Sequence, residues 1–177
     1  MRSPLLPTAT LATNLSSSPN NITFLLSMQS SSSDTPGSSH HLPSELQDKI
    51  LYGERRPPNS NRIVGAHSPK IKTDPNFTVR VINNNSDGTT FVESIKQFPD
   101  GSFSRPKKST LAPDSWSDAK IIDVTNQVAT TPTIHTRSSD GVTFHRETVD
   151  GVEWLVIKDA AGNIESSYPT GGNPITF

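Results

Sequence analysis

Four short segments of the chain hold side chains that could cleave RNA without a metal ion. They supply an imidazole at His67, ammonium groups at Lys107 and Lys108, and several hydroxyl groups, and they span residues 65–68, 107–110, 116–118 and 166–169. An imidazole transfers protons near neutral pH, and a fixed ammonium stabilises negative charge that develops on a phosphate. Such groups could help the 2′-hydroxyl of RNA to attack its own phosphodiester, leaving a 2′,3′-cyclic phosphate and a 5′-hydroxyl.

Each of these residues also has a plainer interpretation. A lone histidine is more often structural than catalytic, and a pair of lysines is often part of a solvated surface. Ser166 and Tyr168 are two residues apart, so in a strand they share one face, where the tyrosine could stack on a base or ribose or be simply half-buried. Trp116 is interpreted as a core aromatic residue.

Basic residues gather near His67 although the net charge is only −1. One group precedes and follows the histidine, and a second surrounds the lysine pair: Arg55, Arg56, Arg62, Lys70 and Lys72, then Arg105, Lys107 and Lys108. A nearly neutral protein can still have a basic cleft that binds phosphate, although the same residues could coat a solvated face.

No metal or other cofactor is expected. The chain has no cysteine, which excludes disulfides and thiolate ligands. His135 and His145 lie ten residues apart in predicted strands, without a neighbouring pattern of carboxylate ligands.

The composition divides the chain into two parts. Residues 1–42 are dominated by Ser, Thr, Pro and Asn, which predicts a disordered leader. Residues 43–177 contain nearly all the charge and both tryptophans, so we expect them to form the folded domain. No segment is long and apolar enough to span a membrane, and the first residues make a poor signal peptide.

The apolar periodicity of the folded part predicts an α+β protein. A helix is expected near Ser44, with Ser44 and Gln47 as a capping box and Gly53 as its end, followed by a loop over residues 55–61. A second helix follows Pro113, capped by Ser115 or Ser117. The expected strands span residues 77–82, 91–98 and 103–106, then 133–137, 142–148, 152–158 and 163–168.

The motifs in these elements resemble those of the bacterial EndoU nuclease domain. They are Lys-Ile-Leu-Tyr-Gly at 49–53, Gly-Ala-His-Ser at 65–68, Lys-Ser-Thr at 108–110, Pro-x-x-Trp-Ser-Asp-x-Lys-Ile at 113–121, and Gly-Asn-Ile-x-Ser-x-Tyr-Pro at 162–169. The likeness covers about residues 44–172 and is strongest to toxin domains at the C-termini of contact-dependent growth inhibition proteins. It implies two small antiparallel sheets with packed helices, as in the barnase-EndoU-colicin-RelE group. It also implies an endoribonuclease that cuts transfer RNA or other single-stranded RNA to cyclic phosphate ends.

The resemblance also assigns roles to individual residues. It implies that His67 is a general acid or base and that Lys107 or Lys108 is the catalytic lysine, with Lys107 favoured. Ser166 and Tyr168 match a Thr-x-Tyr pair that contacts the nucleotide, and Tyr168 joins the catalytic set. Three further residues are assigned to substrate binding: Thr110, Arg55 and Arg56.

One departure from the family pattern leaves the mechanism open. EndoU enzymes commonly have a second histidine a dozen or more residues before the Gly-x-His segment, and this chain has none there. Another group supplies the second proton transfer, or His135 or His145 enters the site, or the protein is catalytically impaired. The alternatives are therefore an RNA-binding module of the same fold, or a structural fragment of a large surface adhesin, which the Ser-rich leader and β-rich body would suit.

A toxin of this kind implies a particular biological setting. The resemblance implies a cognate immunity protein that blocks the cleft, and its acidic surface would complement the basic residues between 55 and 72. We expect a monomer that is secreted or delivered as part of a larger toxin and acts on RNA in the cytoplasm of a target cell.

Overall fold

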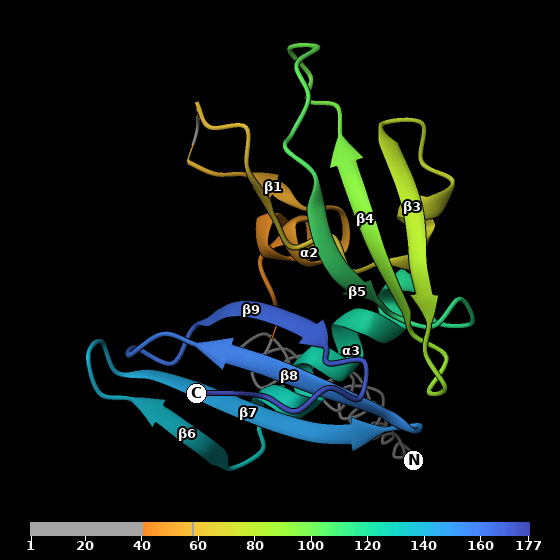
Figure 1. The fold of residues 1–177 in the computed structure, drawn as a ribbon. Helices are drawn as coiled ribbons and strands as arrows, with labels where there is room; N and C mark the ends of the chain where they lie inside the picture. The colour runs from red at the N-terminus through yellow and green to blue at the C-terminus, as the bar shows by residue number, and fades with distance from the viewer. Residues whose placement is uncertain (1–40, 58) are drawn as a thin grey trace, which may run out of the picture. The chain divides into compact units, whose positions relative to one another are not determined.

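The computed structural model describes residues 41–57 and 59–177, and in these residues two α-helices pack with small antiparallel sheets (Figure 1). The prediction of an α+β fold with two small antiparallel sheets and packed helices is confirmed, and a two-stranded ribbon is added to it. The leader predicted over residues 1–42 lies outside the described residues, except for its last two.

Helix α2 (Ser44–Tyr52) begins and ends through backbone contacts. The predicted capping box at Ser44 and Gln47 is wrong, because Pro43 is the N-cap and no side chain caps the helix. The Pro43 carbonyl already accepts the N–H groups of Leu46 and Gln47, both at 3.0 Å, so Ser44 lies within the first turn. Gly53, predicted as the end, closes the helix at a φ of 76° and donates its N–H to the Lys49 carbonyl.

The region after this helix is more ordered than the sequence indicated. The loop predicted over residues 55–61 is confirmed for the described residues after Arg55, whereas Arg55 itself belongs to β1 (Glu54–Arg55), which pairs with β2 (Ile63–Val64). The strand β2 has little apolar periodicity of its own, and Ile63 is held by packing against Val92 and Phe98 in a hydrophobic cluster. Tertiary packing therefore decides the structure of this segment.

The first sheet has the order β3-β4-β5, with β3 (Phe77–Asn84), β4 (Thr90–Lys96) and β5 (Lys107–Leu111). The strand predicted over residues 103–106 is wrong. Phe103 forms only an isolated bridge with Gln97, and the strand begins after Pro106, which has no N–H to give to a ladder. Lys107 and Lys108 therefore start a strand that lies against Ser94 and Glu93 of β4.

The second sheet has the order β6-β7-β8-β9, close to the predicted strands. Its strands are β6 (Thr133–Arg137), β7 (Val142–Val149), β8 (Val152–Lys158) and β9 (Ile164–Pro169). Helix α3 (Asp118–Ala129) packs against this sheet and is capped by Ser117, whose hydroxyl accepts the Lys120 N–H at 3.1 Å. Trp116 is buried and stacks on Trp154 with 5.6 Å between ring centroids, so its predicted core role is confirmed.

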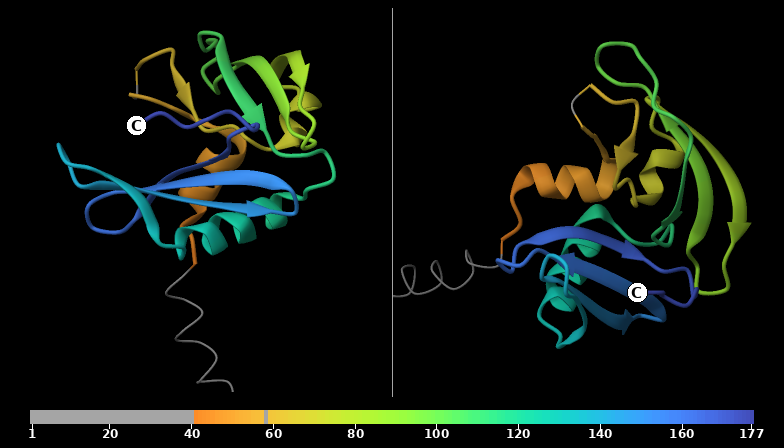
Figure 2. Two further views of the ribbon diagram at one scale, coloured as in Figure 1. Left: turned by 60° about the horizontal axis from the view of Figure 1, so that its bottom comes forward. Right: turned by 60° about the vertical axis from the view of Figure 1, so that its left-hand side comes forward.

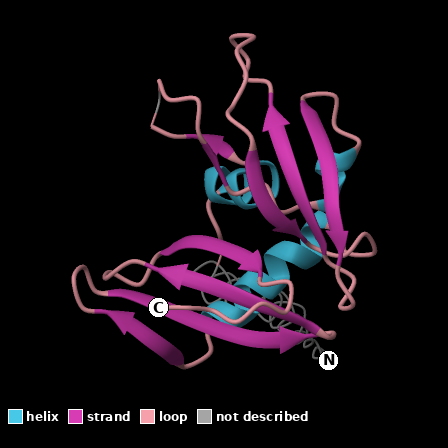
Figure 3. Ribbon diagram, viewed as in Figure 1, coloured by secondary structure: helices cyan, strands magenta, loops and turns pink. Residues whose placement is uncertain are grey.

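The two sheets meet through α2 and through the strands β5 and β9. Figures 2 and 3 show α2 beside both sheets, and Tyr52 at its end contacts the hydrophobic cluster of each. The strands β5 and β9 also contact each other directly. Residues from distant parts of the sequence are thereby brought to one place.

Candidate active site

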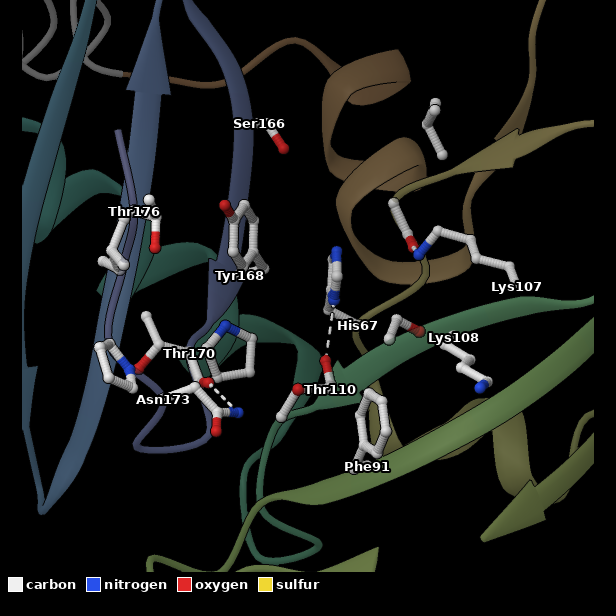
Figure 4. A pocket seen from close by; sticks show the side chains of 16 residues that line it. His67, Phe91, Lys107, Lys108, Thr110, Ser166, Tyr168, Thr170, Asn173 and Thr176 are labelled. Atoms are coloured by element: carbon white, nitrogen blue, oxygen red, sulfur yellow. Dashed lines mark hydrogen bonds between the residues drawn. The ribbon is translucent and has the colours of Figure 1, made fainter. Parts of the chain in front are cut away.

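One cavity of about 560 Å³ is lined by three of the four segments that could carry chemistry. His67 and Gly65 form one part of it, β5 contributes Lys107 to Thr110, and β9 contributes Ser166 and Tyr168 (Figure 4). The segment 116–118 does not line the cavity.

The carboxyl end of helix α2 places His67. The N–H groups of Ala66, His67 and Ser68 donate to the carbonyls of Lys49, Ile50 and Leu51 at 3.1, 2.8 and 3.1 Å. The last carbonyls of a helix have no partner within the helix, so they form a row of acceptors for this segment. His67 is thus fixed by its backbone before its side chain makes any contact.

Gly65 is required for this docking. Its φ is 81°, and a Cβ atom there would lie 1.8 Å from the Lys49 carbonyl oxygen. No side chain can be accommodated without moving α2 away from the segment. Gly65 therefore allows the chain to approach α2 closely enough to place His67.

A single hydrogen bond fixes the tautomer of His67. Its Nδ1 lies 2.9 Å from the Thr110 carbonyl oxygen, which can only accept, so Nδ1 carries the proton and Nε2 carries a lone pair. Burial, together with the nearby charge of Lys107, lowers the pKa of His67 to about 3. The imidazole is therefore neutral at pH 7, and its Nε2 can accept a proton.

The structure distinguishes the two adjacent lysines. The Lys107 ammonium donates to the Gly65 carbonyl at 2.9 Å, and burial lowers the pKa of Lys107 to about 8. Lys108 is exposed and belongs to the other face of β5. Both line the cavity, and the Gly65 carbonyl fixes the position of the Lys107 ammonium there.

Tyr168 completes the group around the imidazole. Its ring stacks on His67 with 5.6 Å between centroids and 28° between planes, and burial raises the pKa of Tyr168. Ser166 shares its face of β9, as the spacing predicted, while Ser167 between them is buried and accepts the Trp154 Nε1–H at 2.6 Å. Tyr168 is therefore a neutral hydroxyl held against the histidine.

Thr110 lines the cavity, whereas Arg55 and Arg56 do not. The guanidinium of Arg55 binds Asp100 at 2.8 Å, donates to the Ser60 carbonyl at 2.7 Å, and lies 4.2 Å from the centre of the Phe98 ring. Arg56 is exposed in the turn after β1. The contacts of Arg55 thus stabilise the β1–β2 ribbon. Neither arginine lies with the other predicted site residues at the cavity.

Neither distant histidine supplies the missing partner. His145 is buried, with Nδ1 at 2.7 Å from the Thr131 carbonyl and Nε2 at 3.0 Å from the Thr143 hydroxyl. His135 stacks on Phe144 and Phe177. Neither lines the cavity, so the structure does not support the alternative in which one of them enters the site.

Tyr52, which precedes Gly65 in the chain, does not line the cavity either. Burial and a hydrogen bond to Asp118 raise the pKa of Tyr52 to about 12. Asp118 also accepts the Ser68 hydroxyl at 2.7 Å. The segment 116–118 therefore supports the site from behind, by tying the end of α2 to the residue after His67.

Sequence reasoning missed several residues that line the cavity. The Ser109 hydroxyl is buried and has no hydrogen-bond partner among the described residues. Ser109 is two residues from Lys107, so strand alternation could have identified it. Phe91 lies opposite Thr110, and residues 173–176 form a further part of the wall. Strand register and chain reversal place these last residues, and neither can be derived from local spacing.

The residues that line the cavity belong for the most part to a region shared with a known protein family. A family model described as bacterial EndoU nuclease matches residues 43–171, more than two thirds of the chain. The chain belongs to the bacterial EndoU nuclease family. No curated protein and no solved structure matches it. The resemblance inferred from the motifs is thus confirmed, and the EndoU match includes the three segments that line the cavity.

Two further features of the described residues concern membranes and metals. None of the helices there has the length and apolarity needed to cross a bilayer. Within the same residues, no three His, Asp or Glu side chains gather where they could hold a metal ion.

Replacing Gly65 should test the docking of residues 65–68 on α2. We expect Gly65→Ala to lower the free energy of unfolding by at least about 3 kcal/mol, because the new Cβ meets backbone. Gly151→Ala is the matched control, with the same φ of 81° and nothing within 4 Å, and should cost about 1 kcal/mol. Urea denaturation of both variants measures the difference, and equal losses would contradict the close approach.

The neutral state of His67 should make stability depend on pH. Its pKa is about 3 in the folded protein and 6.5 when exposed, so on acidification the unfolded chain binds the proton first and stability falls. Each pH unit below about 6.5 should cost about 1.4 kcal/mol until pH falls to about 3. Between pH 6.5 and 5 the wild type should lose about 2 kcal/mol more than His67→Asn, as measured by urea denaturation. Parallel pH profiles would show that the folded protein accommodates a charged imidazole.

Proposed function

We propose that this protein is an endoribonuclease that cleaves single-stranded RNA by metal-independent transphosphorylation. The observation that carries the proposal is the neutral imidazole of His67, which is held in one tautomer by Thr110 in the cavity that Lys107 and Tyr168 also line. Membership of the EndoU family supports nuclease activity. The substrate and the mechanism rest on the chemistry of these groups.

In the proposed reaction His67 is the general base. Its Nε2 takes the proton of the ribose 2′-hydroxyl, the 2′-oxygen forms a bond to phosphorus, and the bond from phosphorus to the 5′-oxygen breaks. The products are a 2′,3′-cyclic phosphate and a 5′-hydroxyl. The neutral imidazole has a lone pair in a fixed position to take this proton, and the burial that keeps it neutral also makes it a weaker base than a free imidazole.

Lys107 takes the place of the histidine that other EndoU enzymes commonly have. With a pKa of about 8 it is protonated at pH 7 and can neutralise the charged phosphorane. It can also give a proton to the departing 5′-oxygen and regain one from His67 through solvent. A lysine with an ordinary pKa would be a much weaker donor.

The other cavity residues bind the nucleotide in this proposal. Tyr168 stacks against the base or ribose and can donate a hydrogen bond, and Ser166 and Thr110 offer hydroxyl groups on either side. Lys108, exposed at the same wall, adds positive charge for the RNA backbone.

The biological role that we propose is that of a toxin, with residues 43–177 as the nuclease domain. Delivery within a larger protein, action on RNA in the target-cell cytoplasm and a cognate immunity protein all follow from the likeness to growth-inhibition toxins. Three of the five cations expected to attract that partner already bind carboxylates: Arg55 binds Asp100, Lys70 binds Asp118 and Lys72 binds Asp114. We therefore propose that the immunity protein covers the cavity at Lys107 and Lys108 instead.

Removing the imidazole tests the general base. We expect His67→Ala to reduce the rate of RNA cleavage by about 10²- to 10⁴-fold, because no other cavity group accepts a proton at neutral pH. His41→Ala, an exposed histidine outside the cavity, is the matched control and should keep full activity. The assay is cleavage of a labelled single-stranded RNA with mapping of 2′,3′-cyclic phosphate and 5′-hydroxyl ends. Salt-sensitive RNA binding without new ends would instead favour an impaired RNA-binding module.

Replacing the lysines separates charge from proton transfer. Lys107→Arg keeps the charge but cannot release a proton, so we expect activity to fall by at least about tenfold. Lys108→Ala should reduce activity much less than Lys107→Ala, since Lys108 is exposed. In the wild type, kcat should decline above about pH 8 as Lys107 loses its proton. Full activity of Lys107→Arg with the same alkaline decline would rule out proton donation.

A further inference from the structure

The chain beyond the family match forms a wall of the same cavity. The EndoU match ends at residue 171, yet Asn173, Pro174, Ile175 and Thr176 all line the cavity. After β9 the chain reverses and runs back along the sheet β6–β9, as the trace to the C label shows (Figure 1). This segment contributes as many lining residues as β5 does.

The wall is held at both of its ends. At one end, Thr170 donates its hydroxyl to Glu153 at 2.7 Å, and Gly171 packs so closely that a Cβ would lie 3.3 Å from Thr110. At the other end, the Phe177 ring stacks on His135 with 4.4 Å between centroids and meets the edge of Phe144 at 5.1 Å. These three rings are called the latch below.

The backbone in the middle of the wall has donors and acceptors without a hydrogen-bond partner among the described residues. Among the described residues, no hydrogen bond involves the backbone C=O groups of residues 174–176 or the N–H groups of Ile175 and Thr176. The wall also carries no charge, whereas the cations of the cavity, Lys107 and Lys108, lie on β5. The cavity therefore has a cationic side suited to phosphate and a neutral side with free donors and acceptors beside Tyr168.

We propose that residues 173–176 are the nucleobase-binding wall of the cavity and that the latch holds this wall in place. The inference rests on the proposed RNA cleavage and adds to it the site of the base. The base lies against Pro174 and Ile175, within reach of Tyr168, and its polar edge meets the free backbone groups of the wall. The scissile phosphate lies on the opposite side, near His67 and Lys107.

Removing the Phe177 ring from the latch tests the role of the wall and leaves His67 and Lys107 unchanged. In Phe177→Ala, KM for a single-stranded RNA should rise about three- to tenfold, while kcat stays within about twofold. Phe177 is 54% exposed, so the fold should tolerate its loss, and Phe103→Ala, at 56% exposed and outside the cavity, is the matched control. Equal KM values for the two variants would overturn the proposal.

Competitive inhibitors locate the effect at the base. The inhibition constants of nucleoside 3′-monophosphates should rise about three- to tenfold in Phe177→Ala, while that of inorganic phosphate stays within about twofold. Equal weakening of nucleotides and phosphate would show general loosening of the cavity and would also overturn the proposal. Failure of the wild type to cleave RNA would overturn the proposed function together with this inference. Cleavage without the Phe177 effects would overturn the inference alone.

Discussion

The site depends above all on the hydrogen bond from the His67 ring to the Thr110 carbonyl. A buried imidazole without a partner would be costly, and this partner comes from a strand more than forty residues away. The bond joins the loop after α2 to β5, fixes which nitrogen keeps its proton, and sets the ring beside Lys107. The His67 carbonyl in turn accepts the N–H of Ala112, the residue after β5, at 2.9 Å. The histidine is therefore both a part of the core and the proposed general base.

Burial gives both titratable groups their chemical character. Desolvation penalises the charged form, so it lowers the pKa of His67 and of Lys107 alike, and the nearby ammonium lowers that of the imidazole further. One cavity therefore holds a neutral imidazole, at His67, and an ammonium that can release its proton, at Lys107. A family member that lacks one histidine could in this way retain two groups for proton transfer. Asp118 contributes at a distance, because it holds Ser68 and Tyr52 behind the imidazole.

Most elements of the fold could be predicted from local patterns. Apolar periodicity and turn residues indicated both helices and six of the seven longer strands, and the Ser117 cap and the Gly53 end were recognisable by residue type. The failures occurred where tertiary contacts outweigh local preference. Pro106 delays the start of β5 to Lys107, the Pro43 carbonyl replaces the Ser44 cap, and pairing with β2 places Arg55 in a strand instead of the predicted loop.

The sequence by itself determined which chemical groups are present and which family they belong to, because residue types and short motifs are local properties. Tertiary structure alone decided which groups meet. It selected Lys107 over Lys108, engaged Arg55 with Asp100 and kept His145 in the other sheet. It also turned residues 173–176 back against a cavity that His67 and β5, far away in the chain, line as well. The reason is physical: strand register, burial and chain reversal depend on contacts between distant segments, and these contacts set both the position and the pKa of each group.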